Sequence, residues 1–262
     1  MWKSMVNWMF ILKSIVIAFS MFSGIPVPQF EWKEREMKYM IAFFPLVGIV
    51  IGAVVFSWSL LCENKGISRG CFVLIGTALP ILLSGGIHLD GYMDTMDALS
   101  SYQDKEKRLA ILKDAHIGAF AVIGTLVYYF IYIGAYMEIE GKEAMVLVAA
   151  GFYLSRILSG ISVVTFSCAK KDGLLYTFSG SAQKTAVRIL LYLQLLLCGG
   201  IMIFFAGKIG VAALFACILL LFYYRQKCTK EFGGITGDTS GYFTLLCEIA
   251  IMLIAAFGLG IK

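Results

Sequence analysis

The sequence predicts an all-α fold: a polytopic integral membrane bundle of about seven transmembrane helices, preceded by an apolar N-terminal helix. Of the 262 residues, 60% are hydrophobic and only 15% are charged, whereas soluble globular proteins carry about 25% charged residues. Residues 41–62 contain no charge and are long enough to cross about 30 Å of hydrocarbon. Because we see no internal repeat and no Pro/Ser-rich linker, residues 1–262 are expected to form one domain.

The N-terminal segment, residues 5–23, is apolar but contains Lys13, and the prolines at 26 and 28 end its helix. It could form a further span, a re-entrant helix or an interfacial helix. No small residues stand where a signal peptidase would cut, so a cleaved signal peptide is not expected. Of the later segments, 209–224 is short for a span. The expected spans are 41–62, about 71–87, about 117–137, 144–166, 187–206, 209–224 and 242–260.

Lysine and arginine fix the expected orientation, because cytoplasmic loops carry an excess of both. If loop 88–116 is cytoplasmic, alternation places 24–40, 167–188 and 225–241 on the same side, and these four loops hold 14 Lys and Arg against five on the other side. The net charge of +5 therefore calls for a membrane surface or a phosphorylated substrate rather than nucleic acid. We expect a multi-pass protein of the cell membrane with these loops in the cytoplasm. The seven scattered cysteines do not indicate a disulfide framework.

The acidic stretch after the second expected span is the strongest functional signal. Asp90, Asp94 and Asp97 are spaced i, i+4, i+7, which places them within about 60° of one another on a helix. Three anions on one stripe repel one another unless a cation lies among them, so the spacing favours a hard divalent metal. The last cytoplasmic loop adds Asp238 within a Gly-rich segment, residues 233–241. A solvated helix face is the alternative for the stripe, and a plain connector is the alternative for the loop.

Carboxylate ligands favour Mg²⁺ or Mn²⁺, and two histidines without a thiolate cluster make a zinc site unlikely. Mg²⁺ beside cationic side chains, here Lys113 and Arg156, is typical of sites that transfer phosphoryl groups. No Walker A or G-x-S-x-G motif occurs. Arg156 could instead pair with Glu248 inside the membrane. Lys113 could be an ordinary positive-inside charge, and His88 an interfacial histidine.

Two acidic motifs are specific when taken together: His88–Gly91 followed by Asp94 and Asp97, and the late segment Gly234–Asp238. On them the chain resembles the cobalamin synthase family, the adenosylcobinamide-GDP ribazoletransferases, over nearly its whole length. Further segments that resemble the family are Phe22–Pro28, Tyr39–Gly52, Ile111–Gly118, Leu154–Arg156 and Asp172–Leu174, with Glu248 following the last motif.

The resemblance implies a Mg²⁺-dependent reaction that ends the assembly of the cobalamin nucleotide loop. The ribose 3′-hydroxyl of α-ribazole, or of its 5′-phosphate, attacks the β-phosphate of adenosylcobinamide-GDP, and GMP leaves. The expected metal ligands are Asp90, Asp94, Asp97 and Asp238. The expected catalytic residues are Asp94, Asp97, Asp238 and His88, of which Asp238 and His88 are alternative bases. The expected contacts to substrate phosphates are Lys113, Arg156, Thr236, Gly237 and Gly91.

The sequence departs from the family pattern at two positions, and two other functions are weighed against the one that the resemblance implies. His116 stands where the family pattern has Arg, and Ala98 where Gly is common. A CDP-alcohol phosphatidyltransferase is disfavoured because its motif needs Ala-Arg after Asp-Gly, where this chain has Asp94-Thr95. A secondary transporter would use intramembrane carboxylates and inverted repeats. The sequence leaves open whether copies form a homo-oligomer.

Overall fold

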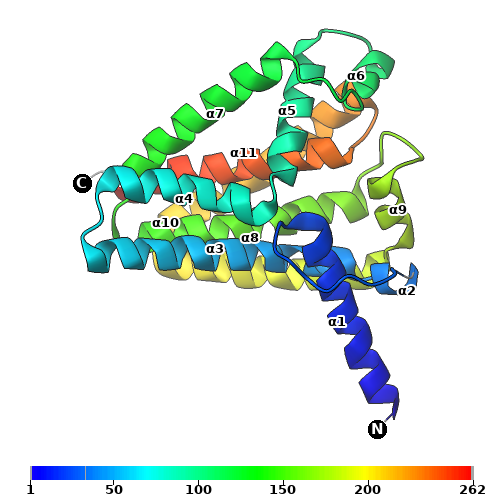
Figure 1. Cartoon of the computed structure of the whole chain (residues 1–262), viewed down its shortest axis with the longest axis horizontal. Coiled ribbons are helices and arrows are strands. Elements are labelled where there is room, and N and C mark those ends of the chain that lie inside the picture. The colour runs from blue at the N-terminus through cyan, green and yellow to red at the C-terminus, as the bar shows by residue number, and fades with distance from the viewer. Residues whose placement is uncertain (1, 33, 261–262) are drawn as a thin grey trace.

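The computed structural model describes residues 2–32 and 34–260, and within these ranges the chain is helical with no β-strand (Figure 1). The one extended contact is an isolated parallel bridge between Cys168 and Ile235. The helices are α1 (Trp2–Phe22), α2 (Glu34–Met37), α3 (Met40–Lys65), α4 (Arg69–Ser84), α5 (Ile87–Ser100), α6 (Lys105–Ile111), α7 (Ala119–Met137), α8 (Gly141–Thr165), α9 (Leu174–Ser181), α10 (Lys184–Phe232) and α11 (Gly237–Ala255), followed by the π-helical turn Ala256–Gly260.

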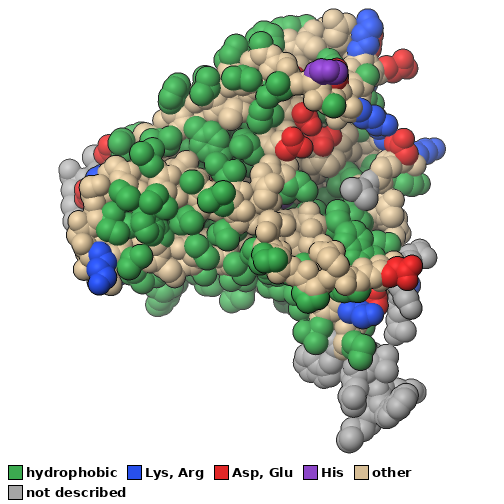
Figure 2. All heavy atoms as spheres, viewed as in Figure 1, with side chains coloured by type: hydrophobic (Ala, Val, Ile, Leu, Met, Phe, Trp, Pro, Cys, Tyr) green, Lys and Arg blue, Asp and Glu red, His purple; other side chains and the backbone are tan. Residues whose placement is uncertain are grey.

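Helix α8 forms the centre of the bundle. It packs against α3, α10 and α11, and every residue from Gly151 to Val164 is buried. Buried polar groups on this helix find partners within the bundle: Ser155 and Ser162 donate to carbonyls of their own helix, and Arg156 pairs with Glu248. The long helices that surround α8 carry exposed leucine, isoleucine and phenylalanine on their outer faces, and Figure 2 shows this apolar surface. Such an outer face suits a hydrocarbon environment.

Within residues 2–32 and 34–260, five helices are long and apolar enough to cross a membrane, and α4 with α5 forms a sixth candidate that bends by 93°. Helix α10 is counted once although it consists of two arms. At Gly207 the backbone has φ 52° and ψ −127°, which is not helical. Arg188 Nε donates to Val164 O (3.1 Å), and the Tyr224 ring lies 6.4 Å from that of Phe166. Both ends of α10 therefore lie at the same end of α8, and its arms correspond to the expected spans 187–206 and 209–224.

Helix α1 leaves the bundle steeply near the end where α2 and α9 lie (Figure 1). The part of α1 whose side chains the structure describes, Met9–Phe22, is apolar and carries one charged residue, Lys13. Lys13 forms an ion pair of 2.8 Å with Glu36, so α1 is tied to the α2 segment. The three expectations for the N-terminal segment stay predictions.

The four loops expected on one side of the membrane lie together at one end of the bundle. Gln183 N donates to Lys38 O (3.1 Å), Arg108 pairs with Glu231, and Lys113 pairs with Asp172 (3.6 Å). Charged side chains also gather at this end in Figure 2. Lys33, which was counted in the first of these loops, lies outside the described residues.

Candidate functional site

A sharp turn redirects the chain just before the acidic stretch. Gly85 (φ 66°) and Gly86 (φ 76°) both adopt left-handed backbone conformations, which glycine reaches without the steric cost of a Cβ atom. This pair ends α4 and begins α5 at an angle of 93°. The structure gives them the turn that directs α5 toward the charged end of the bundle.

Helix α5 then crosses α11 at two further glycines. A Cβ atom on Gly91 would lie 2.7 Å from Asp238 O, and one on Gly241 would lie 2.8 Å from His88 O. Neither position has room for a side chain, so the two backbones touch. The contact places Asp90 and Asp94 of α5 beside Asp238 in the first turn of α11. Gly91, expected near a phosphate, thus lies at the helix crossing.

The start of α11 is fixed by Thr236, whose side chain accepts from Thr239 N (3.1 Å), while Thr236 N donates to Thr239 Oγ1 (2.9 Å). This reciprocal capping box satisfies two backbone donors that the first turn would leave open. Asp238 follows at the positive end of the helix dipole, where a carboxylate is stabilised. The Gly-rich loop is therefore a helix start that presents a carboxylate, and a plain connector does not describe it.

The carboxylates form an electrostatic cluster. Asp94 experiences Coulomb repulsion from Asp90, Asp238 and Asp97. Among the described residues, no three His, Cys, Asp or Glu side chains already converge at metal-binding distance. The donor chemistry nevertheless fits a hard divalent cation, because these are carboxylate oxygens and a cation would relieve their repulsion.

Asp97 stands apart from the other carboxylates. Its Oδ2 accepts from Gly118 N (2.6 Å) and its Oδ1 from Ala121 N (2.8 Å), and both donors belong to the first turn of α7. These are bonds that a helix-capping carboxylate makes, although the residue is remote in sequence. The sequence spacing did not suggest this role. The expected metal and catalytic roles of Asp97 remain predictions.

A cavity of about 380 Å³ opens beside the cluster. Asp90 and Asp238 line it together with Lys113 and Lys170. Thr236, Gly237 and His88 also lie on its wall, as expected, while an apolar part of the lining comes from α1, α3 and α9. The cavity therefore brings acidic and basic groups from loops far apart in sequence to a single space.

Lys170 is the member of the site that the sequence did not distinguish from neighbouring Lys171. Its Nζ donates to Leu109 O (2.9 Å). Burial and the nearby Lys113 ammonium lower the pKa of Lys170, and Asp172 partly opposes this effect. A second anion at this position would relieve the repulsion between the two ammonium groups, so the pair is suited to binding phosphate.

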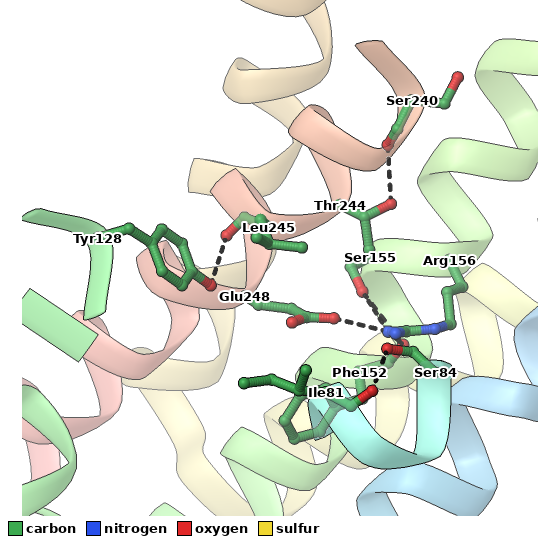
Figure 3. Close-up of polar contacts among 10 residues, drawn as sticks. All are labelled: Ile81, Ser84, Tyr128, Phe152, Ser155, Arg156, Ser240, Thr244, Leu245 and Glu248. Carbon is green, nitrogen blue, oxygen red and sulfur yellow. Dashed lines mark hydrogen bonds and ion pairs between the residues drawn. The ribbon is translucent and has the colours of Figure 1, made fainter. Parts of the chain in front are cut away.

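Arg156 does not line this cavity. Its Nη1 donates to Glu248 Oε1 (2.7 Å), Phe152 O (2.9 Å) and Ser155 Oγ (3.2 Å), as Figure 3 shows. The two charged side chains are 2% and 8% exposed. The alternative in which Arg156 pairs with Glu248 is therefore what the structure shows. His116 is also remote: its exposed ring lies 2.7 Å from Asp114 Oδ1.

Comparisons with known proteins agree with these motifs. The family model described as "Cobalamin-5-phosphate synthase" matches residues 14–256. A protein named adenosylcobinamide-GDP ribazoletransferase from Lachnoclostridium phytofermentans is 42% identical over 250 residues, covering 95% of each chain. Proteins of the same name from Clostridium botulinum and Clostridium perfringens are 34% and 31% identical, covering 91% and 92% of this chain and 95% and 96% of theirs. No solved structure matches. The chain belongs to the cobalamin-5-phosphate synthase family.

Proposed function

We propose that this chain is an adenosylcobinamide-GDP ribazoletransferase that works at the membrane surface. The single observation that supports this most strongly is the cavity of about 380 Å³, which is lined by Asp90 and Asp238 and also by Lys113 and Lys170. Carboxylates that hold a divalent cation, together with ammonium groups that bind phosphate oxygens, are what a diphosphate substrate requires. The names of the relatives supply the substrate class.

The proposed reaction joins adenosylcobinamide-GDP to α-ribazole or α-ribazole 5′-phosphate. The ribose 3′-oxygen forms a bond to the phosphorus that carries the cobinamide group, and the bond from this phosphorus to the bridging oxygen breaks. GMP leaves with the bridging oxygen, and the hydroxyl proton passes to a base. The products are adenosylcobalamin, or its 5′-phosphate, and GMP.

Mg²⁺ is the proposed cofactor, held by Asp90, Asp94 and Asp238. The two hydrogen bonds that Asp97 accepts at the start of α7 favour a structural role over its predicted role as a ligand. Bound Mg²⁺ would neutralise charge on the diphosphate oxygens. Lys113 and Lys170 would bind phosphate oxygens in the same cavity. Thr236 and Gly237 would place the start of α11, with its backbone N–H groups, beside the anion.

Two side chains can take the proton of the attacking hydroxyl. Asp238 is anchored at the start of α11 on the cavity wall, and His88 reaches the same cavity from α5. A carboxylate and an imidazole both act as general bases in enzymes.

The function is tested by incubating purified protein with adenosylcobinamide-GDP, α-ribazole and Mg²⁺ and measuring GMP. We expect GMP to appear in step with the corrinoid product. Release of CMP from CDP-alcohols would point to a phosphatidyltransferase, and flux across proteoliposomes without turnover would point to a transporter. Either result without GMP release would contradict the proposal.

Orientation is proposed on the charge distribution. The end of the bundle that holds Lys113, Lys170, Arg108 and the cavity faces the cytoplasm, because positively charged loops are retained there. The corrinoid and nucleotide substrates would then enter from the cytoplasm.

A further inference from the structure

A second, much smaller cavity shares the lining residue His88 with the reaction cavity. Its volume is about 20 Å³, and we call it the inner chamber because its wall comes from the centre of the helix bundle. Helices α4, α5, α7, α8 and α11 all contribute to its wall. His88 lines both cavities, so the two cavities meet at this residue. Arg156 and Glu248 line the inner chamber and not the reaction cavity.

Two nitrogen atoms on this wall are buried without a partner among the described residues: Nε of Arg156 and Nε2 of His88. Arg156 is 1% exposed and His88 is 7% exposed, so bulk water does not satisfy them. The Nη1 atom of Arg156 is fully used on Glu248, Phe152 and Ser155, as Figure 3 shows. Nε remains as a donor, and a buried unsatisfied donor is costly.

The volume of the inner chamber matches one water molecule, which needs about 10–15 Å³ of this kind of space and two or more polar partners. Arg156 Nε can only donate, because guanidinium has no acceptor. A water that accepts from it can donate its own hydrogen to His88 Nε2.

We propose that Arg156 is a positioning residue, which holds the His88 imidazole through one water molecule bound in the inner chamber between Arg156 Nε and His88 Nε2. This inference rests on the proposed function, because it assigns His88 to the wall of that reaction cavity. Glu248 in turn fixes the guanidinium. The buried ion pair thus acts on the substrate only through His88.

This arrangement sets the hydrogen-bonding role of His88. With Nε2 accepting from the water, the proton of the neutral ring lies on Nδ1. The ring then offers a donor to a substrate oxygen and has no free lone pair for a proton. Asp238 is left as the base for the attacking hydroxyl.

The matched variants for the test are Arg156→Lys and Thr77→Val. Lysine keeps a cation for Glu248 but lacks the planar Nε–H that points into the inner chamber. Thr77 also has a buried hydroxyl without a partner among the described residues, yet it lines neither cavity. We expect Arg156→Lys to lower kcat about 10- to 100-fold with little change in KM for adenosylcobinamide-GDP, because misplacing a group at the site slows the chemical step. Thr77→Val should keep the wild-type kcat.

A second variant covers the case in which Arg156→Lys fails to fold. Arg156→Met combined with Glu248→Leu removes both charges together, and buried ion pairs replaced by apolar side chains usually leave a stable fold. This double variant should melt near the wild-type temperature in detergent and show the same loss of kcat.

A spectroscopic measurement makes the test independent of turnover. The chain has only two histidines, so a His116→Gln background labelled with ¹⁵N-histidine reports on His88 alone. We expect the Nδ1-protonated tautomer, with a hydrogen-bonded Nε2 whose signal moves in Arg156→Lys and stays in place in Thr77→Val.

Three outcomes would overturn the proposal. An unchanged kcat with an unmoved Nε2 signal would make the ion pair purely structural. A raised KM for adenosylcobinamide-GDP at unchanged kcat would make Arg156 a phosphate contact. An Nε2-protonated ring in the wild type would exclude a water that donates to Nε2, and with it the assignment of Asp238 as the base. If the wild type releases no GMP at all, the proposed function fails, and the Nε2 signal still decides whether Arg156 holds His88.

Discussion

Replacing Asp97 and Asp94 separately with Asn should separate a structural carboxylate from a functional one. Asp97 accepts two hydrogen bonds, of 2.6 and 2.8 Å, from the first turn of α7. In Asp97→Asn only one oxygen remains, and the amide NH₂ group faces a backbone donor. A hydrogen bond to a charged group contributes about 1.5–3 kcal/mol, and the charge at the helix start adds about 0.3–1 kcal/mol.

The expected loss for Asp97→Asn is therefore about 2–4 kcal/mol of stability. For a chain of this size, about 2–4 °C is lost per kcal/mol. The melting temperature in detergent should fall by roughly 4–16 °C. Asp94→Asn should not lower it, because that substitution removes repulsion from Asp90, Asp97 and Asp238.

The effects on activity should be reversed, with Asp94→Asn losing more activity than Asp97→Asn. Asp94→Asn should abolish GMP release while the protein stays folded, because a proposed Mg²⁺ ligand is lost. Asp97→Asn should keep measurable activity at temperatures well below its melting point. An Asp97→Asn protein that melts like the wild type and is inactive would refute the capping argument and make Asp97 a ligand or catalytic group. Near-normal activity of Asp94→Asn in Mg²⁺ buffer would refute its role as a ligand.

Three further predictions concern the cavity and the helix crossing. Gly91→Ala should reduce both activity and melting temperature, because its Cβ would lie 2.7 Å from Asp238 O, whereas Gly134→Ala, with no atom within 4 Å, should be neutral in thermal melts. Lys170→Met should raise KM for adenosylcobinamide-GDP. Because the pKa of Lys170 is lowered, the KM of the wild type should begin to rise at a lower pH than the loss of the proton from an ordinary lysine would cause. A Lys170→Met variant whose KM follows the same pH profile as that of the wild type would argue against this contact. EDTA should stop turnover, and added Mg²⁺ should raise the melting temperature of the wild type but not of Asp94→Asn; a shift of equal size in both would contradict the metal site.

Much of the fold was predictable because a bilayer imposes length and polarity on each span. The segments at 41–62, 117–137 and 144–166 match α3, α7 and α8 within a few residues at each end. The reversal within α10 was also expected, since the apolar stretches on either side of Gly207 were read as two spans. The sharp bend after α4 was not, because the glycines at 85 and 86 are equally compatible with close helix packing.

Many residues of the site were predictable from motifs, but the contacts that some of them make were not. The i, i+4, i+7 spacing placed Asp90, Asp94 and Asp97 on one stripe, but it could not show that Asp97 reaches the start of α7. That contact depends on where α7 begins relative to α5, which no local pattern encodes. For the same reason the sequence could not decide whether Arg156 meets Glu248 or a phosphate.

The most direct test of the account is a turnover assay on the purified full-length protein with adenosylcobinamide-GDP, α-ribazole and Mg²⁺. The account predicts one GMP for each corrinoid product from the wild type and none from Asp94→Asn at equal folded protein. Wild-type protein that is folded, binds Mg²⁺ and releases no GMP would contradict it.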